Sequence, residues 1–343
     1  AMKQQPRFNT FALAFLLVLS ACQKSFDVPA NTGTDNTSTQ TSSDPNYAWE
    51  LMTMTYPGLK DYEAGSFVIG TRAYVLDVQG HLWSLESGAN SWVRKADLPF
   101  RNPPDPNGYF LLFYPIVFSV GDKGYVTCGH WSFQNIGIID QGSSTTVWEY
   151  DASKDFWTVR ADFAGTPRIM PVAVPGADFA LVGLGISQKQ PISTASEFLR
   201  YTPASDHWST APDCSKNIIQ GTGFLSDGNS YLIGDEPVAG STSGHDNRLF
   251  KFTSDNWQEL ASVGNARDWF TFATPYARKA FAVSTSDNAS TLVSFDLSSG
   301  ATARHSALPV AYSPGGTSFI FRLGGTLYLG DLLQKKIWTC KLG

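Results

Sequence analysis

Charged side chains are scarce in this sequence: Asp, Glu, Lys and Arg make up 16% of the 343 residues, and the formal net charge is −5. Lysine and arginine form no cluster, which argues against nucleic acid or an anionic membrane surface as the main partner. Histidine is scarce too, and no C-x-x-C, H-x-E or H-E-x-x-H motif occurs. Without ligands at metal spacing, no metal or other cofactor is predicted.

The sequence also has little cysteine and no long stretch with helical period. After Cys22 the three remaining cysteines are far apart, so we expect buried thiols, with one strained disulfide as the alternative. What is abundant instead is aromatic residues, at 13%, with 30 Gly and 19 Pro. This composition is typical of an all-β protein with many short strands and tight turns.

The N-terminal residues 1–21 have the pattern of a signal peptide. Lys3 and Arg7 precede an apolar run over 11–19, which is too short to cross a bilayer as a helix. The run ends in Leu-Ser-Ala-Cys at 19–22, which resembles a bacterial lipobox. That resemblance implies lipidation of Cys22 and, because Gln23 is not acidic, an outer-membrane lipoprotein. A plain secretory signal with a chance cysteine is the alternative.

The segment that follows has almost no large apolar residues between 25 and 46. Such a composition cannot bury enough surface to offset the entropy of ordering, so 22–46 is predicted to be a flexible tether. The folded domain is expected over 47–343.

A short motif is repeated through this domain: a strand, a turn of small polar residues, and a second strand entered through tryptophan. Its clearest copy is VWEYDASKDFWTVR at 147–160. A second repeated element is a hairpin with a glycine-containing turn and a Tyr or Phe. Its aromatic positions are spaced by 51, 54, 52, 50 and 47 residues, namely Tyr74, Tyr125, Phe179, Tyr231, Phe281 and Tyr328. The chain therefore contains six units of about fifty residues, each predicted to hold strands a to d.

Four-stranded units of this length bury their faces when they pack around an axis, which predicts a six-bladed β-propeller. The last unit ends after a strand c, at 337–343, and the first ordered segment, 47–52, looks like a strand d without a hairpin before it. We therefore expect the N-terminal strand to complete the last blade and close the ring, which removes an exposed edge.

The unit resembles the kelch repeat, with its glycine after strand b, its aromatic partner and its tryptophan in strand d. The resemblance covers 47–343 and implies a kelch-type propeller. The sequence departs from the kelch pattern in two respects. The fifth unit lacks the strand-d tryptophan, and the double glycine survives only as single residues, at Gly129, Gly183, Gly234 and Gly330.

The b–c loops are longest in units two, three and four, and a long d–a connection at 101–108 is expected on the same face, since strand direction alternates. Long loops on a rigid scaffold often bind ligands, and neutral insertion is the alternative. The loops supply His130, Trp131, Lys189 and Glu236 as candidate ligand contacts.

Basic residues precede strand a in four units, at Arg101, Arg168, Lys216 and Arg267, the last followed by Asp268 and Trp269. Resemblance to kelch-like propellers implies that they surround the mouth of the central channel. Guanidinium groups beside aromatic faces suit a carboxylate-bearing ligand or a sugar. The alternative for each arginine is a local ion pair with an acid.

Three functions remain open. The preferred one is a non-catalytic envelope protein, anchored by lipid only and monomeric, that binds a glycan, a peptide or an envelope protein on the long-loop face. An enzyme resembling the kelch-fold sialic acid mutarotases would need Arg168 or Arg267 with Glu236 or Asp268 as acid and base. The third is a structural scaffold subunit. Binding is preferred because spacing fixes no acid/base pair.

Overall fold

The computed structural model describes residues 47–60, 62–99, 109–135, 138–188, 193–214, 218, 220–237, 245–253, 255–264, 268–286, 289–312 and 316–343. These residues form β-strands and a single 3₁₀ turn, η1 (Pro203–Ser205). The signal peptide, Cys22 and the tether lie outside them. Within this part of the chain, no helix is long and apolar enough to cross a membrane.

Six antiparallel sheets of four strands follow one another along the described chain. Their strands are β2 (Glu63–Ile69), β3 (Arg72–Asp77), β4 (Leu82–Glu86) and β5 (Val93–Arg94); β7 (Ile116–Val120), β8 (Lys123–Thr127), β11 (Val147–Asp151) and β12 (Phe156–Arg160); β14 (Val172–Pro175), β15 (Ala180–Gly183), β18 (Phe198–Thr202) and β19 (His207–Ala211); β20 (Gln220–Ser226), β21 (Asn229–Pro237), β22 (His245–Thr253) and β23 (Asn256–Ser262); β24 (Trp269–Tyr276), β25 (Lys279–Ser286), β26 (Ala289–Asp296) and β27 (Thr302–Ala307); and β28 (Ser318–Leu323), β29 (Thr326–Asp331), β30 (Lys336–Lys341) and β1 (Trp49–Leu51).

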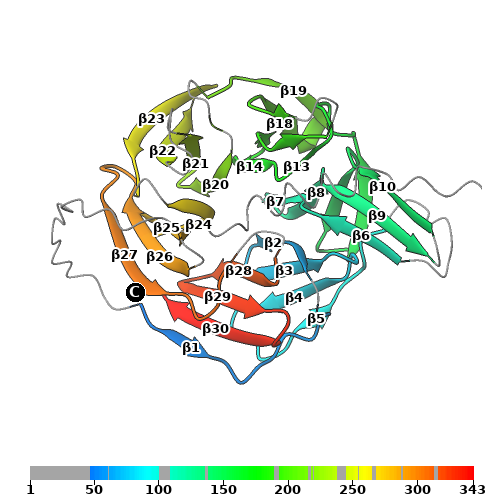
Figure 1. Ribbon diagram of the computed structural model, residues 1–343, viewed down its shortest axis with the longest axis horizontal. Helices are drawn as coiled ribbons and strands as arrows, with labels where there is room; N and C mark the ends of the chain where they lie inside the picture. The colour runs from blue at the N-terminus through cyan, green and yellow to red at the C-terminus, as the bar shows by residue number, and fades with distance from the viewer. Residues whose placement is uncertain are drawn as a thin grey trace, which may run out of the picture. The chain divides into compact units, whose positions relative to one another are not determined.

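The first strand of each sheet contacts the first strand of the next. β2 packs against β7, β7 against β14, β14 against β20, β20 against β24, β24 against β28, and β28 against β2. In Figure 1 these six strands lie nearest the middle of the arrangement, and the later strands of each sheet lie further out. This order of contacts fits a β-propeller, and a tryptophan-bearing outer hairpin is found where 147–160 predicts one, as β11 and β12.

Hydrophobic side chains fill the space between each pair of neighbouring sheets. Between the first and second four-stranded sheets, for example, Phe67 stacks on Tyr74 and both rings meet Tyr150. Equivalent clusters join every successive pair and also join the last sheet to the first, where Phe319 packs against Tyr56. Each sheet thus buries both faces against its neighbours, which explains the nearly continuous burial of second strands such as β3 and β15.

The repeated residues of the sequence have structural reasons. Five of the six predicted aromatic positions lie in the second strand of a sheet; the exception is Phe179, which lies just before β15. A glycine at or near the end of this strand allows a ring to approach the backbone. A Cβ on Gly330 would lie 2.0 Å from the Phe319 ring, and one on Gly183 would lie 2.6 Å from the Phe198 ring. Neither position can accept a side chain without a shift of its neighbour.

The N-terminal strand pairs where the sequence predicts. In register, Trp49 lies opposite Cys340 and Leu51 opposite Trp338, so β1 is the outer strand of the sheet that holds the C-terminal residues. Tyr47 packs into the same core cluster, against Phe281. The two ends of the described chain therefore share one sheet.

The long loops of the second and third units form two further three-stranded sheets. β9 (His130–Asn135) and β10 (Ile138–Ser143) make a hairpin that pairs with β6 (Tyr109–Phe113), which follows the long d–a connection. β16 (Ile186–Ser187) pairs with both β13 (Arg168–Ile169) and β17 (Ser193–Thr194). Because β6 pairs with β9, the segment after the long d–a connection lies beside the long b–c loop of the second unit, as the alternation of strand direction predicts.

Candidate functional site

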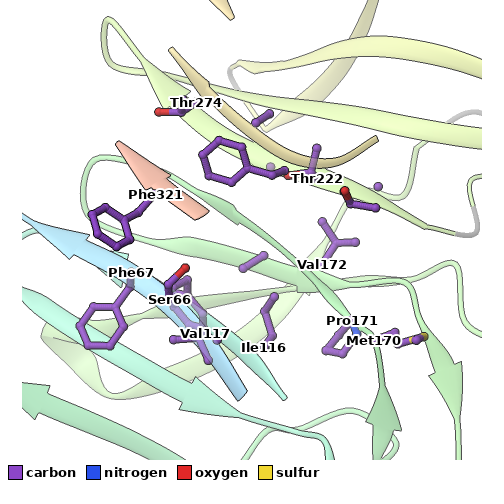
Figure 2. Close-up of a pocket in the computed structure, with 18 of the residues that line it drawn as sticks. Ser66, Phe67, Ile116, Val117, Met170, Pro171, Val172, Thr222, Thr274 and Phe321 are labelled. Atoms are coloured by element: carbon purple, nitrogen blue, oxygen red, sulfur yellow. The ribbon is translucent and has the colours of Figure 1, made fainter. Parts of the chain in front are cut away.

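A cavity of about 390 Å³ lies among the six first strands. Each of them contributes to the wall, so the cavity occupies the middle of the sheet arrangement. Figure 2 shows Ile116, Val117, Val172 and Thr222 around it, with Thr274 and Phe321 toward one end. The cavity is a product of the repeat itself, because each unit offers the free edge of its first strand to the centre.

Glu63 is an acidic residue in this wall, and the residues packed around it shield it almost completely from water. It begins β2, is 2% exposed, and its Oε1 has no hydrogen-bond partner among the described residues. Burial raises the pKa of the Glu63 carboxyl to about 8, and a hydrogen bond with Ser66 only partly opposes this rise. At neutral pH the carboxyl therefore holds its proton, and Oε1 is an unused acceptor.

Other polar groups lie in the same wall. The Oγ1 atom of Thr271 is buried without a partner in the described part of the chain. Tyr312 is buried, and both its burial and the Glu63 carboxyl hold the pKa of its hydroxyl above the usual value. Because buried polar atoms are normally hydrogen-bonded, two unsatisfied atoms in one cavity indicate a place for a ligand or ordered water.

The opposite end of the cavity carries a cation. Arg322 in β28 donates its Nε–H to Thr274 Oγ1 at 3.0 Å and an Nη1–H to the carbonyl of Gly324. No carboxylate pairs with Arg322 among the described residues, and burial lowers the pKa of its guanidinium. Its positive charge therefore lies beside the cavity without a counter-ion from this part of the protein.

Arg168, a predicted ligand contact, is instead fully buried and does not belong to the cavity wall. Its guanidinium donates to the carbonyl oxygens of Thr166 and Leu184 and pairs with Glu197. The ring of Phe163 lies 5.0 Å from its Cζ atom. This is the local pairing that the sequence offers as the alternative, and Arg168 takes no part in the cavity wall.

The remaining candidates are dispersed. Trp269 begins β24 and lines the cavity. His130 and Trp131 belong to β9, where Trp131 packs beside Gly142. Glu236 lies opposite Asp246 in the register of β21 and β22. Arg101, Lys189, Lys216 and Arg267 lie outside the described residues. Of the described candidates, Trp269 alone is part of the wall.

Asp268, considered as an acid or base, is held in a buried network. Both its carboxylate oxygens lie 2.8 Å from Nη1 of Arg304, and Ser284 donates to Oδ1 at 2.5 Å. A carboxylate held by these hydrogen bonds has a structural role between β24, β25 and β27.

Sequence analysis missed Glu63, Thr271 and Arg322. Glu63 begins β2 and Thr271 lies near the start of β24, and nothing in one sequence separates a buried Glu or Thr from a solvated one. Arg322 did carry a signal: it is the charged residue within the otherwise apolar run SFIFRL of an innermost strand.

Three of the cysteines lie in the described part of the chain. Cys128, Cys214 and Cys340 are free thiols; Cys128 and Cys340 are buried as predicted, whereas Cys214 is only partly buried. Burial raises the pKa of the Cys128 thiol to about 12. In the same part of the chain, no group of three His, Cys, Asp or Glu side chains is placed to hold a metal ion.

Comparison with known proteins identifies the fold and not a family. No protein-family model matches the chain, and no curated protein matches its sequence. A solved structure of YjhT is similar, with a TM-score of 0.60 and 12% identity, covering 82% of this chain and 94% of that one. In all, 770 chains of solved structures match. A fold this widespread supports many activities, so function has to be argued from the site.

Proposed function

We propose that this chain is a lipid-anchored binding protein of the bacterial outer membrane, built as a six-bladed kelch-type propeller that β1 closes. The central cavity holds part of a glycan or peptide, and the long loops of units two to four contact the remainder. The described domain is monomeric and touches the membrane only through the lipid on Cys22. The signal pattern, the cyclic strand contacts and the cavity support this proposal.

The observation that carries the binding function is the unpartnered Oε1 of buried Glu63. At neutral pH the carboxyl holds its proton and Oε1 has no partner among the described residues, while the Ser66 hydroxyl donates to the carbonyl of Ile320 at 3.0 Å. This arrangement leaves Oε1 free to accept a hydrogen bond from a hydroxyl or amide of the ligand. Trp269 and Phe272 offer aromatic faces in the same wall for the apolar side of a sugar ring.

A screen with variants of one residue tests this proposal. The full chain is applied to arrays of glycans and peptides, together with Glu63→Gln, Glu63→Leu and the control Glu86→Leu. Gln has the same donor and acceptor as a protonated Glu, so Glu63→Gln retains binding. Glu63→Leu weakens it about tenfold or more, because roughly 1.4 kcal/mol is lost with the hydrogen bond. Glu86 lies partly exposed on β4, and its replacement leaves binding unchanged. Equal binding by both Leu variants would contradict the assignment.

An enzyme similar to the sialic acid mutarotases is the second candidate, and Glu63 is the observation that favours it. A carboxyl with a pKa near neutrality inside a cavity has the properties of a general acid or base. In that case Glu63→Gln would bind sugar but lose anomer exchange measured by NMR. Retained exchange in Glu63→Gln, or none in the unaltered chain, would exclude this enzyme function for Glu63.

A further inference from the structure

Arg322 and Glu63 lie at opposite ends of the same cavity. The amide of Glu63 donates to the carbonyl of Gly316 and Ser66 contacts the carbonyl of Ile320, so β2 and β28 run side by side in the same direction. Arg322 lies two residues beyond Ile320. Since a strand advances about 3.3 Å per residue, Arg322 lies on the order of 15 Å along the cavity from Glu63.

The donors of Arg322 are only partly used by the protein. Nε donates to Thr274 and Nη1 to Gly324, which fixes the guanidinium plane and leaves Nη2 without an acceptor among the described residues. These two bonds hold the side chain, yet neither neutralises it. Arg322 is partly buried, and a cation that has lost part of its water without gaining a counter-ion favours an anion that pairs with it.

Most other described arginines have a carboxylate partner, which makes Arg322 different. Arg72 pairs with Glu86, Arg160 with Glu149 and Arg304 with Asp268. These pairs show how the fold satisfies arginines that have only a structural role. Arg322 has instead a hydroxyl, a carbonyl and a cavity.

We propose that Arg322 is an anion subsite at the end of the cavity away from the long loops, and that it takes the carboxylate of a small organic ligand. It is distinct from the mouth of the channel, where the resemblance to kelch-like propellers predicts the basic residues before strand a. The inference rests on the proposed binding function and adds its substrate class: a ligand with a carboxylate at one end and a hydrogen-bond donor, which meets Glu63, at the other. A carboxylate suits the guanidinium because its two oxygens can accept parallel N–H donors.

The test uses acetate as the probe and acetamide, which has a similar shape without charge, as its matched control. Binding to the full chain is followed by the ¹⁵N NMR signal of the Arg322 Nε–H group, identified by its absence in Arg322→Gln. Acetate should shift this signal saturably and acetamide should not. The control Arg278→Gln, which removes an exposed arginine from the β24–β25 turn, should leave the acetate effect unchanged.

Two outcomes overturn the proposal: no saturable shift with acetate, or an equal shift with acetamide. Arg322→Lys keeps the positive charge but loses the parallel N–H donors of the guanidinium, so acetate should still perturb the neighbouring Thr274 signals, with weaker affinity. Thermal unfolding of both Arg322 variants shows that they are folded. The array separates this inference from the binding function. One result would keep the binding function and contradict the anion subsite. In that result only neutral ligands bind, their binding depends on Glu63, and Arg322→Gln binds them as tightly as the unaltered chain does.

Discussion

Trp157 donates its indole N–H to the backbone carbonyl of Ala96, 2.8 Å away at the end of the preceding four-stranded sheet. The same bond recurs from Trp208 to Ala161, at 3.0 Å, and from Trp257 to Pro212, at 2.8 Å. The repeated tryptophan therefore does more than fill space. It ties the outer hairpin of one sheet to the last strand of the sheet before it.

Replacement of Trp157 by Phe should lower the free energy of unfolding by about 1–3 kcal/mol, because the carbonyl of Ala96 loses its partner along with the indole ring. Trp92 provides a matched control. It occupies the same position of the first unit, but its Nε1 is buried without an acceptor in the described residues. Trp92→Phe should cost less. Equal losses in urea unfolding would show that ring volume alone matters.

Arg168→Met should destabilise the protein by about 3 kcal/mol, since it leaves the buried carbonyl of Leu184 and the partly buried carbonyl of Thr166 unpaired. Arg72→Met should cost less than about 1 kcal/mol, because the Arg72–Glu86 pair is more than a third exposed on both sides. Denaturant unfolding of the two variants checks the difference. A stable Arg168→Met variant with weaker ligand binding would restore Arg168 as a binding residue.

The strands and their grouping into sheets were predictable because the pattern of each unit is local. A glycine or aspartate at the turn permits a left-handed backbone, as at Asp155 (φ 51°) and Gly121 (φ 58°), and the aromatic residues mark the faces that meet. The two three-stranded sheets were not predictable. β6 pairs with β9 across an insertion, and such pairing depends on neighbouring loops and not on a repeated pattern.

Removal of residues 47–54 should lower the thermal transition of the whole domain, because it exposes the edge of β30 and removes Tyr47 and Trp49 from the core between the last two sheets. Removal of 25–46, which the composition predicts to be a tether, is the control and should leave the melting curve unchanged. An unaltered transition after deletion of 47–54 would mean that β1 adds no stability.

Glu63 should make stability fall as pH rises. Its folded pKa of about 8 lies above the usual value near 4.3, so between these values the folded state keeps a proton that the unfolded state releases. The stabilising effect is complete below about pH 4 and is lost by about pH 8. Glu63→Gln removes the titrating carboxyl. The free energy of unfolding of this variant minus that of the unaltered protein should therefore rise by at least ~1 kcal/mol from pH 5 to pH 8. Urea unfolding at the two pH values measures this, and a constant difference would place the Glu63 carboxyl in water.

The candidate site was less predictable than the fold, for a physical reason. Burial of Glu63 results from six strand edges that meet at a centre, and a single sequence does not report which of its acidic residues lie there. The basic residues before strand a were the stronger ligand-binding candidates in the sequence. Of these, Arg168 pairs with Glu197 and does not line the cavity. Trp269 was found because it lies at the start of an innermost strand.

The most direct test of the cavity as the binding site is to fill it. Thr222 lines the wall in Figure 2, whereas Thr158 is exposed on the outer strand β12. The affinity of a ligand taken from the array is measured for Thr222→Trp and for the control Thr158→Trp. The account predicts at least tenfold weaker binding for Thr222→Trp alone; unchanged affinity in a folded Thr222→Trp variant would contradict it.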